Sequence, residues 1–327
     1  MTATATPDLL HLHDVGALRA AIEGDVVTPA DETWDEARLA WNLAVDQRPL
    51  AVVLAHSPED VVEVVDYARS RGITVAPQGT GHFAPARGSV DGSILLRTDR
   101  MRGVSIDADA RIARVEAGVL WQEVADAAAE HGLAGLAGSS PDVGVVGYSL
   151  GGGIGWLARR YGAAANSVVA VELVTADGRL VRADGETYAD LFWAVRGGGG
   201  SFGIVTALEF RLYPVSEIYA GVLFWPLQRA REILGAWRDW ADTVPNEVTS
   251  VGRVMHFPPL PMIPEPLRAR SFVIVEAAIL GSEDEARKLL QPLRELGPEM
   301  DTVATIPAKR LSEVDSTDHD QPGRRLE

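Results

Sequence analysis

The alternation of apolar and polar positions divides the first part of the chain into short strands and helices. "AVVLA" (51–55) is a continuous apolar run, which is typical of a buried strand. After Ser57 the apolar residues recur with helical spacing as far as Gly72, and "ITVAP" (73–77) then returns to a strand pattern. Ser57 is a favoured N-cap residue and Gly72 a favoured terminator, so the pattern predicts a strand–helix–strand unit.

The next segments favour two hairpins with helices between and after them. "SILLRT" (93–98) has the composition of a strand. "VSIDADARIARVEAG" (104–118) alternates on either side of an Asp-Ala-Asp centre, which is typical of a hairpin. The residues from Trp121 onward favour a helix, 168–183 favours a second hairpin, and "YADLFWAVRG" (188–197) favours another helix.

Glycine-rich segments stop after the first two thirds of the chain, and longer strands follow. Strands are predicted at "AGVLFW" (220–225), "VTSVGRVMHF" (248–257) and "SFVIVEAAIL" (271–280). Helices are predicted around 227–241 and 282–296. Strands covered by helices on one face form an α+β layer, so the predicted fold class of the chain is α+β.

Composition changes this picture little, but charge and cysteine content exclude several partners. Of the 327 residues, 46% are hydrophobic, enough for a buried core. There are 30 Lys and Arg against 46 Asp and Glu, a net charge of −16, so neither nucleic acid nor an anionic membrane is an expected partner. The absence of cysteine excludes disulfides and thiolate metal sites. Without a recognisable signal peptide or a long apolar run, the expected location is cytoplasmic.

"GYSLGGGIG" (147–155) contains two different motifs, of which the first surrounds Ser149. The spacing Gly-x-Ser-x-Gly is that of the nucleophile elbow of serine hydrolases. An elbow also needs an acid and a histidine later in the chain, and neither His256 nor His319 stands at the end of a clear strand. A serine hydrolase that uses Ser149 is therefore kept as a remote alternative.

The second motif is the run of three glycines, which is one of three glycine-rich clusters. In chain order the first cluster is "QGTGH" (78–82), the second is "GYSLGGGIG" (147–155) and the third is "RGGGGSFG" (196–203), and all three lie next to predicted strands. Backbone without Cβ atoms lets N–H groups approach an anionic ligand, so converging clusters favour a large anionic cofactor over simple turns. None of them is a P-loop or a Rossmann motif. His82 has no second ligand nearby at metal spacing, so we expect it beside the cofactor rather than on a metal.

Three long motifs follow one another over about residues 30–215. They are "RPLAVVLAHSPEDVVEVVDYARSRGITVAPQGTGH", "GSSPDVGVVGYSLGGGIGWLARRYGAAANSVVAVELVTADGRLVRAD" and "DLFWAVRGGGGSFGIVTALEF". In this order they resemble the flavin-binding domain of the FAD-linked oxidases with the fold of p-cresol methylhydroxylase and vanillyl-alcohol oxidase, the berberine bridge enzyme-like group in particular. The resemblance implies two α+β subdomains that hold FAD between them, followed by a substrate domain with an antiparallel sheet.

The resemblance also implies which residues bind FAD. His82 matches the histidine that is joined covalently to the flavin C8α methyl, and a neutral imidazole is a competent nucleophile for that bond. Ser140 stands where bicovalent members have cysteine, and Gln78 and Ser201 stand where many members have arginine and asparagine. Ser149 becomes a loop residue beside the cofactor. The implied cofactor-binding residues are Gly79, Thr80, Gly81, His82, Phe83, Ser140, Gly144, Gly147, Tyr148, Gly151, Gly152, Gly153, Gly155, Asn166, Val169, Ile204 and Val205.

The implied domains are a lead-in over 1–45, an FAD-binding domain over 46–215 and a partial substrate domain over 216–300. Residues 301–327 lack periodicity and are expected to form a poorly ordered tail. Family members usually continue further, so we expect the antiparallel sheet of the substrate domain to be incomplete. An unpaired sheet edge favours self-association.

The function that follows is an FAD-dependent oxidase. It would take hydride from an alcohol, a sugar or an aromatic small molecule and pass electrons to dioxygen. The alternative is a truncated homologue that binds flavin but is catalytically inactive. The sequence indicates no catalytic base.

Overall fold

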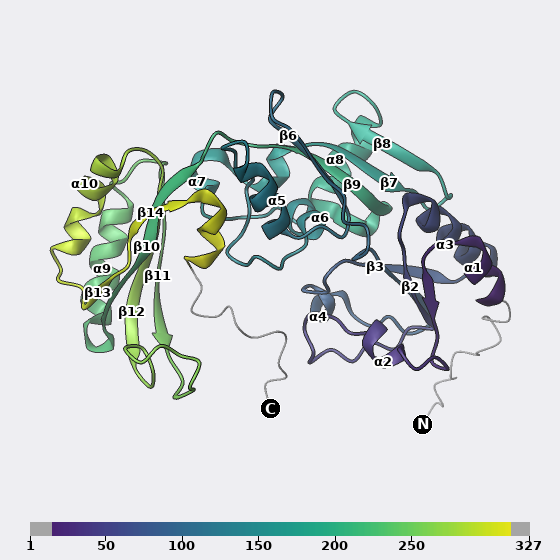
Figure 1. Cartoon of the computed structure of the whole chain (residues 1–327), viewed down its shortest axis with the longest axis horizontal. Coiled ribbons are helices and arrows are strands. Elements are labelled where there is room, and N and C mark those ends of the chain that lie inside the picture. Colours follow the sequence, from purple (N-terminus) through teal and green to yellow (C-terminus); the bar gives the residue numbers. More distant parts are fainter. Residues whose placement is uncertain (1–14, 315–327) are drawn as a thin grey trace.

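A computed structural model describes residues 15–314 of the chain, which form three β-sheets in sequence order. Figure 1 shows the first sheet with its helices at one end of the molecule, the third sheet at the other end and the second sheet between them. Within this part of the chain, no helix combines the length and the apolar character needed to cross a membrane.

The first sheet has the order β1-β2-β4-β3, and β4 runs parallel to both of its neighbours. β1 comes from the predicted lead-in and pairs antiparallel with β2. α1 and α3 pack on one face and α2 on the other. The elements are α1 (Val15–Ala21), β1 (Asp25–Val27), α2 (Trp34–Ala37), β2 (Ala51–Leu54), α3 (Pro58–Arg71), β3 (Thr74–Gln78), α4 (Ala84–Arg87) and β4 (Ser93–Arg97).

α3 begins and ends where the sequence predicts. The Ser57 hydroxyl accepts a hydrogen bond from the Asp60 N–H, and Pro58 occupies the first helical position. Gly72 ends the helix with φ at +67°, a conformation that glycine adopts without strain. The strand–helix–strand prediction is therefore confirmed, although β4 separates the two strands in the sheet.

The second sheet is antiparallel throughout, in the order β5-β6-β9-β7-β8. β5 with β6 and β7 with β8 are the two predicted hairpins, and β9 lies between them. α5, α6 and α8 pack on one face around a fully buried apolar core. The elements are β5 (Val104–Asp107), β6 (Ile112–Glu116), α5 (Trp121–Ala129), α6 (Val145–Leu150), α7 (Ala158–Tyr161), η2 (Ala164–Ser167), β7 (Val168–Val174), β8 (Leu180–Asp184), α8 (Ala189–Gly198), η3 (Gly199–Ser201) and β9 (Ile204–Arg211).

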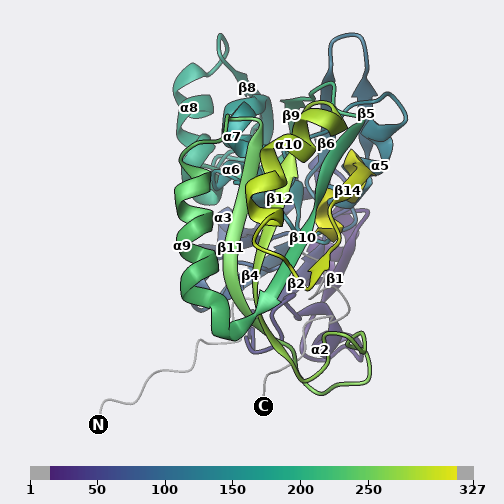
Figure 2. The same cartoon turned by 90° about the vertical axis from the view of Figure 1, so that its left-hand side faces the viewer.

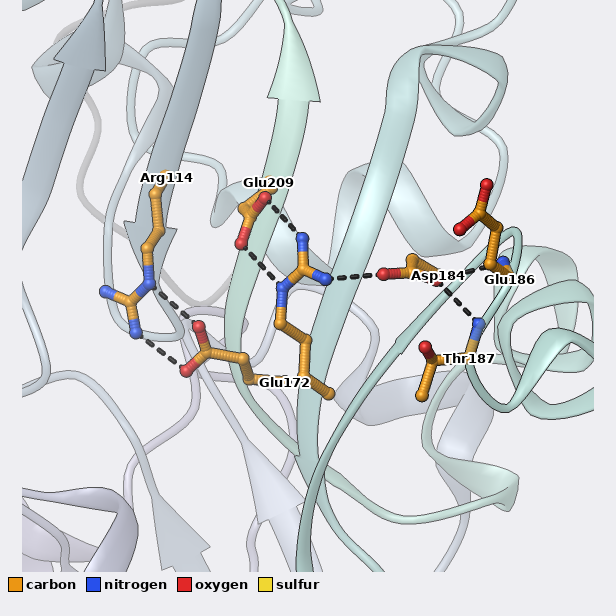
Figure 3. A network of polar contacts seen from close by, with 7 residues as sticks. Arg114, Glu172, Asp184, Glu186, Thr187 and Glu209 are labelled. Carbon is orange, nitrogen blue, oxygen red and sulfur yellow. Dashed lines mark hydrogen bonds and ion pairs between the residues drawn. The ribbon is translucent and has the colours of Figure 1, made fainter.

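The opposite face of the second sheet carries charged side chains in cross-strand pairs (Figure 3). Arg114 on β6 donates two hydrogen bonds of 2.8 and 2.7 Å to Glu172 on β7. Arg182 on β8 donates two, of 3.0 and 2.8 Å, to Glu209 on β9. Partly exposed ion pairs of this kind contribute up to about 1 kcal/mol each. This face is therefore a solvated surface, and the glycine clusters lie elsewhere.

The third sheet has the order β11-β12-β10, and β13 and β14 pair with the other edge of β10. α9 and α10 lie along one face (Figure 2), where they bury alternate residues of β12. Phe272 and Ile274 of β12 point to the opposite face. The elements are β10 (Glu217–Pro226), η4 (Leu227–Arg229), α9 (Ala230–Ala241), β11 (Val248–His256), β12 (Ser271–Ile279), α10 (Glu283–Arg294), β13 (Met300–Asp301), β14 (Ala304–Pro307) and η5 (Ala308–Glu313).

The structure corrects two expectations. Residues 301–314 are not a poorly ordered tail, because β14 pairs with β10 and η5 packs near α5, whereas 315–327 lie outside the described residues. Strands of two and four residues are too short for alternation to be recognised in a sequence. The stretch 147–155 is not all loop, because its first four residues belong to α6. The expected self-association stays a prediction.

Candidate functional site

Residues in or next to the three glycine-rich clusters come close to the end of β3, where the first sheet adjoins the second. The methyl group of Thr80, just after β3, lies 3.7 Å from the position that a Cβ on Gly144 would occupy. Pro77, near the end of β3, lies 3.8 Å from the corresponding position on Gly200. Gly144 precedes α6 and Gly200 follows α8, so segments far apart in the sequence come together here. We call this place the junction.

The glycines of the second cluster have two different roles. A Cβ on Gly155 would lie 1.8 Å from a carbonyl oxygen of the preceding loop, and one on Gly153 would lie 2.6 Å from the Tyr148 ring. These two positions need glycine for the fold itself. Gly147 and Gly152 have no atom of a neighbouring segment within 4 Å of such a Cβ, although the φ of +115° at Gly152 also requires glycine. Their backbone is open, which suits a ligand that approaches it closely.

His82 has a polar or aromatic neighbour on each side. Its Nδ1 lies 2.7 Å from the Thr80 hydroxyl, and its ring stacks on Trp41 with the centroids 4.1 Å apart. Its Nε2 faces the Asp142 carboxylate at 3.8 Å and has no hydrogen-bond partner among the described residues. Burial lowers the pKa of His82, and the charge of Asp142 partly opposes this shift. The ring is therefore neutral at pH 7, the form in which one nitrogen keeps a free lone pair.

The buried side-chain amides of Gln47 and Gln78 form a pair next to the loop that carries His82. Gln78, the last residue of β3, accepts a hydrogen bond of 2.9 Å from the Nε2 of Gln47. The Nε2 of Gln78 and the Oε1 of Gln47 have no partner in the described structure, although both side chains are almost fully buried. An unpaired buried polar atom costs about 1–3 kcal/mol. These atoms therefore leave hydrogen-bonding capacity unused beside the first cluster.

Tyr148 brings a further unpaired atom to the second cluster. Its ring packs edge-on against Trp121 with centroids 5.7 Å apart, and its hydroxyl is buried without a partner among residues 15–314. Burial raises the pKa of this phenol, so the hydroxyl keeps its proton at any pH near neutrality. Tyr148 can donate a hydrogen bond but cannot act as an anionic base.

The remaining predicted cofactor residues lie at different depths in the structure. Phe83 follows His82 and exposes 73% of its surface. Ser140 lines a small pocket together with Trp121 and Lys309. Asn166 is exposed on η2, and no described contact joins it to the first cluster.

Val169, Ile204 and Val205 belong to neighbouring strands of the second sheet. Val169 is half-buried on β7, at an irregularity in its pairing with β9. Ile204 and Val205 are buried at the start of β9, where they pair with β7. β6 pairs with β9 only from Ala207 onward, so the first residues of β9 extend beyond that strand.

The structure does not support Ser149 as a nucleophile. Ser149 lies inside α6 with 1% of its surface exposed, rather than at a sharp turn after a strand. His256 is on β11 of the third sheet, where its Nδ1 lies 2.7 Å from the Ser271 hydroxyl, and His319 lies outside the described residues. The nucleophile-elbow motif is therefore a coincidence of spacing in a glycine-rich chain.

Two residues that the sequence prediction missed contact the first cluster. The indole N–H of Trp41 donates a hydrogen bond of 2.6 Å to Asp142, and the backbone N–H of Trp41 donates one of 2.9 Å to the Thr80 carbonyl. Trp41 and Asp142 are 101 positions apart in the chain. No motif or periodicity links two single residues at that separation, so the sequence carried no signal for this contact.

Comparison with known proteins finds an FAD binding domain and several similar oxidases. Residues 49–184 match the family model of an FAD binding domain. (R)-6-hydroxynicotine oxidase of Paenarthrobacter nicotinovorans is 32% identical over 278 residues, which cover 85% of this chain and 59% of that protein. The crystal structure of 6-hydroxy-D-nicotine oxidase from Arthrobacter nicotinovorans has a TM-score of 0.83 at 29% identity, covering 92% of this chain and 66% of its own.

A further solved structure bears on the cofactor. It is a glucooligosaccharide oxidase from Acremonium strictum with a 6-S-cysteinyl, 8α-N1-histidyl FAD, and it has a TM-score of 0.77 at 28% identity. The match covers 91% of this chain and 62% of that one. This chain thus spans between 59% and 66% of the length of the three relatives.

Proposed function

We propose that this chain binds FAD at the junction and serves as an oxidase. The reason is that it belongs to the FAD-linked oxidoreductases and carries their FAD binding domain. The observation that carries the proposal is that residues in or next to all three glycine clusters come close to the end of β3, and that His82 follows this strand. The open backbone at Gly147 and Gly152 and the unpaired atoms of Gln47 and Gln78 fit a large polar ligand there.

Several of the predicted cofactor residues have a place in this proposal. Residues 79–83 would wrap the pyrophosphate with backbone N–H groups, and the open glycines of 147–152 would lie beside it. Ile204 and Val205, at the start of β9, would present backbone to the adenine. His82 would anchor the flavin covalently through an imidazole nitrogen, as a histidyl link does in the glucooligosaccharide oxidase.

Bound FAD supplies a hydride acceptor, which no amino-acid side chain can provide. The chain's own contribution is to orient the cofactor, to exclude water and to hold donors such as the protonated Tyr148 in fixed positions. Reducing equivalents would pass to dioxygen. The donor would be an alcohol, a sugar or an aromatic small molecule, in line with relatives named for 6-hydroxynicotine and for glucooligosaccharides.

The third sheet offers a polar contact for such a donor. Glu276 on β12 has 2% of its surface exposed and forms a 2.6 Å ion pair with Arg253 on β11. Its position alternates with Val275 and Ala277, so it lies on the face away from α9 and α10. On that same face Ala278 packs with Trp156, in a core that also contacts Tyr148. We therefore place the substrate between this face and the junction.

Binding of FAD is tested by reconstitution. Purified protein incubated with FAD is expected to become yellow and to gain about 2.7 kcal/mol of stability at a free FAD concentration 100 times the Kd. In the wild type part of the flavin should survive acid precipitation, and in His82→Ala all of it should be extractable. Protein that stays colourless and gains no thermal stability would overturn the proposal.

Oxidase activity is tested separately on the reconstituted protein. Anaerobic mixing with 6-hydroxynicotine, an oligosaccharide or a benzylic alcohol should bleach the flavin with at least one donor, and air should restore the colour with formation of hydrogen peroxide. Bound flavin that none of these donors reduces would favour the catalytically inactive homologue.

A further inference from the structure

Trp41, Asp142 and His82 contact one another in pairs, and we call them the anchor cluster. The Trp41 ring stacks on the His82 ring at an interplanar angle of 19°. One carboxylate oxygen of Asp142 accepts the Trp41 indole N–H at 2.6 Å, and the other lies 3.8 Å from the Nε2 of His82. The backbone N–H of Trp41 donates a hydrogen bond to the Thr80 carbonyl. Trp41 therefore links the Asp142 carboxylate to the loop that carries His82.

The two nitrogens of His82 therefore face different partners. Nε2 faces a carboxylate, which can only accept a proton or a hydrogen bond. Nδ1 faces the Thr80 hydroxyl at 2.7 Å, which can donate as well as accept. At 3.8 Å the carboxylate acts through its charge rather than through a hydrogen bond, and that charge favours the tautomer with the proton on Nε2. The lone pair then lies on Nδ1, with Thr80 donating to it.

We propose that Asp142, fixed by the indole of Trp41, sets the tautomer of His82 and thereby selects Nδ1 as the nitrogen that bonds to FAD. The inference rests on the proposed FAD binding. Asp142 and Trp41 are positioning residues in this account, because they act on the flavin only through His82.

The attachment step balances with dioxygen as the oxidant. A bond forms between Nδ1 and the 8α carbon of FAD, and one C–H bond of that carbon breaks. Its proton goes to solvent, its electron pair reduces the isoalloxazine, and dioxygen then takes up two electrons and two protons to give hydrogen peroxide. Substitution at Nδ1 leaves the imidazole cationic until Nε2 releases its proton. The Asp142 carboxylate stabilises this cation from a position fixed in advance.

The tautomer is measured without any flavin, by nitrogen-15 NMR of histidine-labelled protein. The chain has seven histidines, and the resonances lost in His82→Ala identify His82. In the wild type we expect the proton on Nε2. In Asp142→Asn we expect a mixture of tautomers and a lower His82 pKa, since a carboxylate no longer faces the ring. Asp142→Glu should restore the wild-type pattern, and Asp109→Asn, on an exposed turn, should leave it unchanged.

Attachment is measured by incubating flavin-free protein with FAD in air and following covalent flavin by intact mass. Asp142→Asn is expected to slow attachment about tenfold or more, with non-covalent FAD affinity within about threefold of the wild type. Trp41→Phe keeps an aromatic ring but loses the indole N–H, so we expect it to slow flavin attachment less than Asp142→Asn does. Trp193→Phe, at an exposed position on α8, is the matched control and should attach flavin at the wild-type rate.

The outcomes separate this inference from the proposed function. Wild-type protein that binds no FAD contradicts the proposed function, and the NMR measurement still decides the tautomer. Wild-type protein that binds FAD but never forms the bond contradicts the attachment step. An unchanged tautomer and an unchanged attachment rate in Asp142→Asn would overturn the role of Asp142.

Discussion

The third sheet and the junction both bury aromatic side chains, but they treat the polar atoms of these side chains differently. In the third sheet the indole N–H of Trp225 donates to the Leu296 carbonyl at 3.2 Å, and that of Trp240 donates to the Leu289 carbonyl at 2.8 Å. The Trp225 bond joins β10 to the segment that follows α10, and the Trp240 bond joins α9 to α10. The apolar core of this unit therefore contains its aromatic residues without leaving their N–H groups unpaired.

Around the junction the same kinds of atoms are unpaired. The indole N–H groups of Trp121 and Trp156, the hydroxyl of Tyr148 and the Nε2 of His82 are buried and have no hydrogen-bond partner in the described part of the chain. Native proteins rarely leave such atoms unpaired. This difference supports the proposed FAD site at the junction, whereas the third sheet pairs these polar atoms within itself. Substitutions should therefore affect stability in the first region and ligand binding in the second.

The largest effect on stability is expected for Trp225→Ala. This side chain has no exposed surface, and removing a large buried aromatic group costs about 3–5 kcal/mol. Urea unfolding of the third sheet should show the loss, while FAD affinity stays unchanged. Trp193→Ala removes an indole that is 75% exposed and is the matched control. A comparable loss of unfolding free energy in both variants would show that Trp225 is not part of a packed core.

A smaller loss is expected for Gly155→Ala. Its Cβ would overlap a carbonyl oxygen at 1.8 Å, so the backbone must shift at a cost of about 1–3 kcal/mol. Gly147→Ala is the matched variant. It lies in α6 with open space around it, so the helix should gain up to about 1 kcal/mol while FAD binds more weakly. Urea unfolding and FAD titration of both variants check the two roles, and equal destabilisation would refute the distinction between them.

The charged face of the second sheet should contribute less. Arg182→Gln removes the pair with Glu209, whose partly exposed side chains predict a loss of about 1 kcal/mol at most. A double-mutant cycle with Glu209→Gln isolates the interaction. It should weaken in 1 M salt, because exposed charges are screened. If 1 M salt does not reduce the coupling energy, the pair is less accessible to solvent than the exposure of its side chains indicates.

The smallest effect is a pH dependence from His82. Its pKa lies below the ordinary value of 6.5 because the ring is buried, so the folded state binds fewer protons than the unfolded state below that pH. The contribution of His82 to the free energy of unfolding should be constant above pH 6.5. It should fall as the pH decreases from 6.5 towards the pKa of His82 in the folded state. His82→Ala should remove this part of the profile. Chemical denaturation at several pH values tests it, and a wild-type profile identical to that of the variant would refute it.

Local signals in the sequence predicted most of the fold. Ser57, Pro58 and Gly72 define the ends of α3, and alternating hairpins define the second sheet, because these features depend on neighbouring residues. α6 was missed because Gly147 suggested a loop, although the flanking apolar residues are buried in the core of the second sheet. β14 was missed because its place is set by pairing with β10, which lies far earlier in the chain.

The site was predictable to the level of its loops but not of its contacts. Runs of glycine are visible in a sequence, and the structure brings residues in or next to three of them close to the end of β3. The anchor cluster depends on Trp41 meeting Asp142 across 101 positions, and only the folded chain brings them together. The sequence also could not separate Gly155, which the fold requires, from Gly147, which has open space.

Strand β10 has consequences for how the protein is made. One of its edges is covered by β12 and the other by β13 and β14, and all three emerge from the ribosome later. Roughly eighty residues must be synthesised after β10 before its ladder is complete, and until then a nearly all-apolar strand has an unpaired edge. Slow translation prolongs that exposure, so we expect it to favour aggregation of the nascent chain and to lower the yield of folded protein.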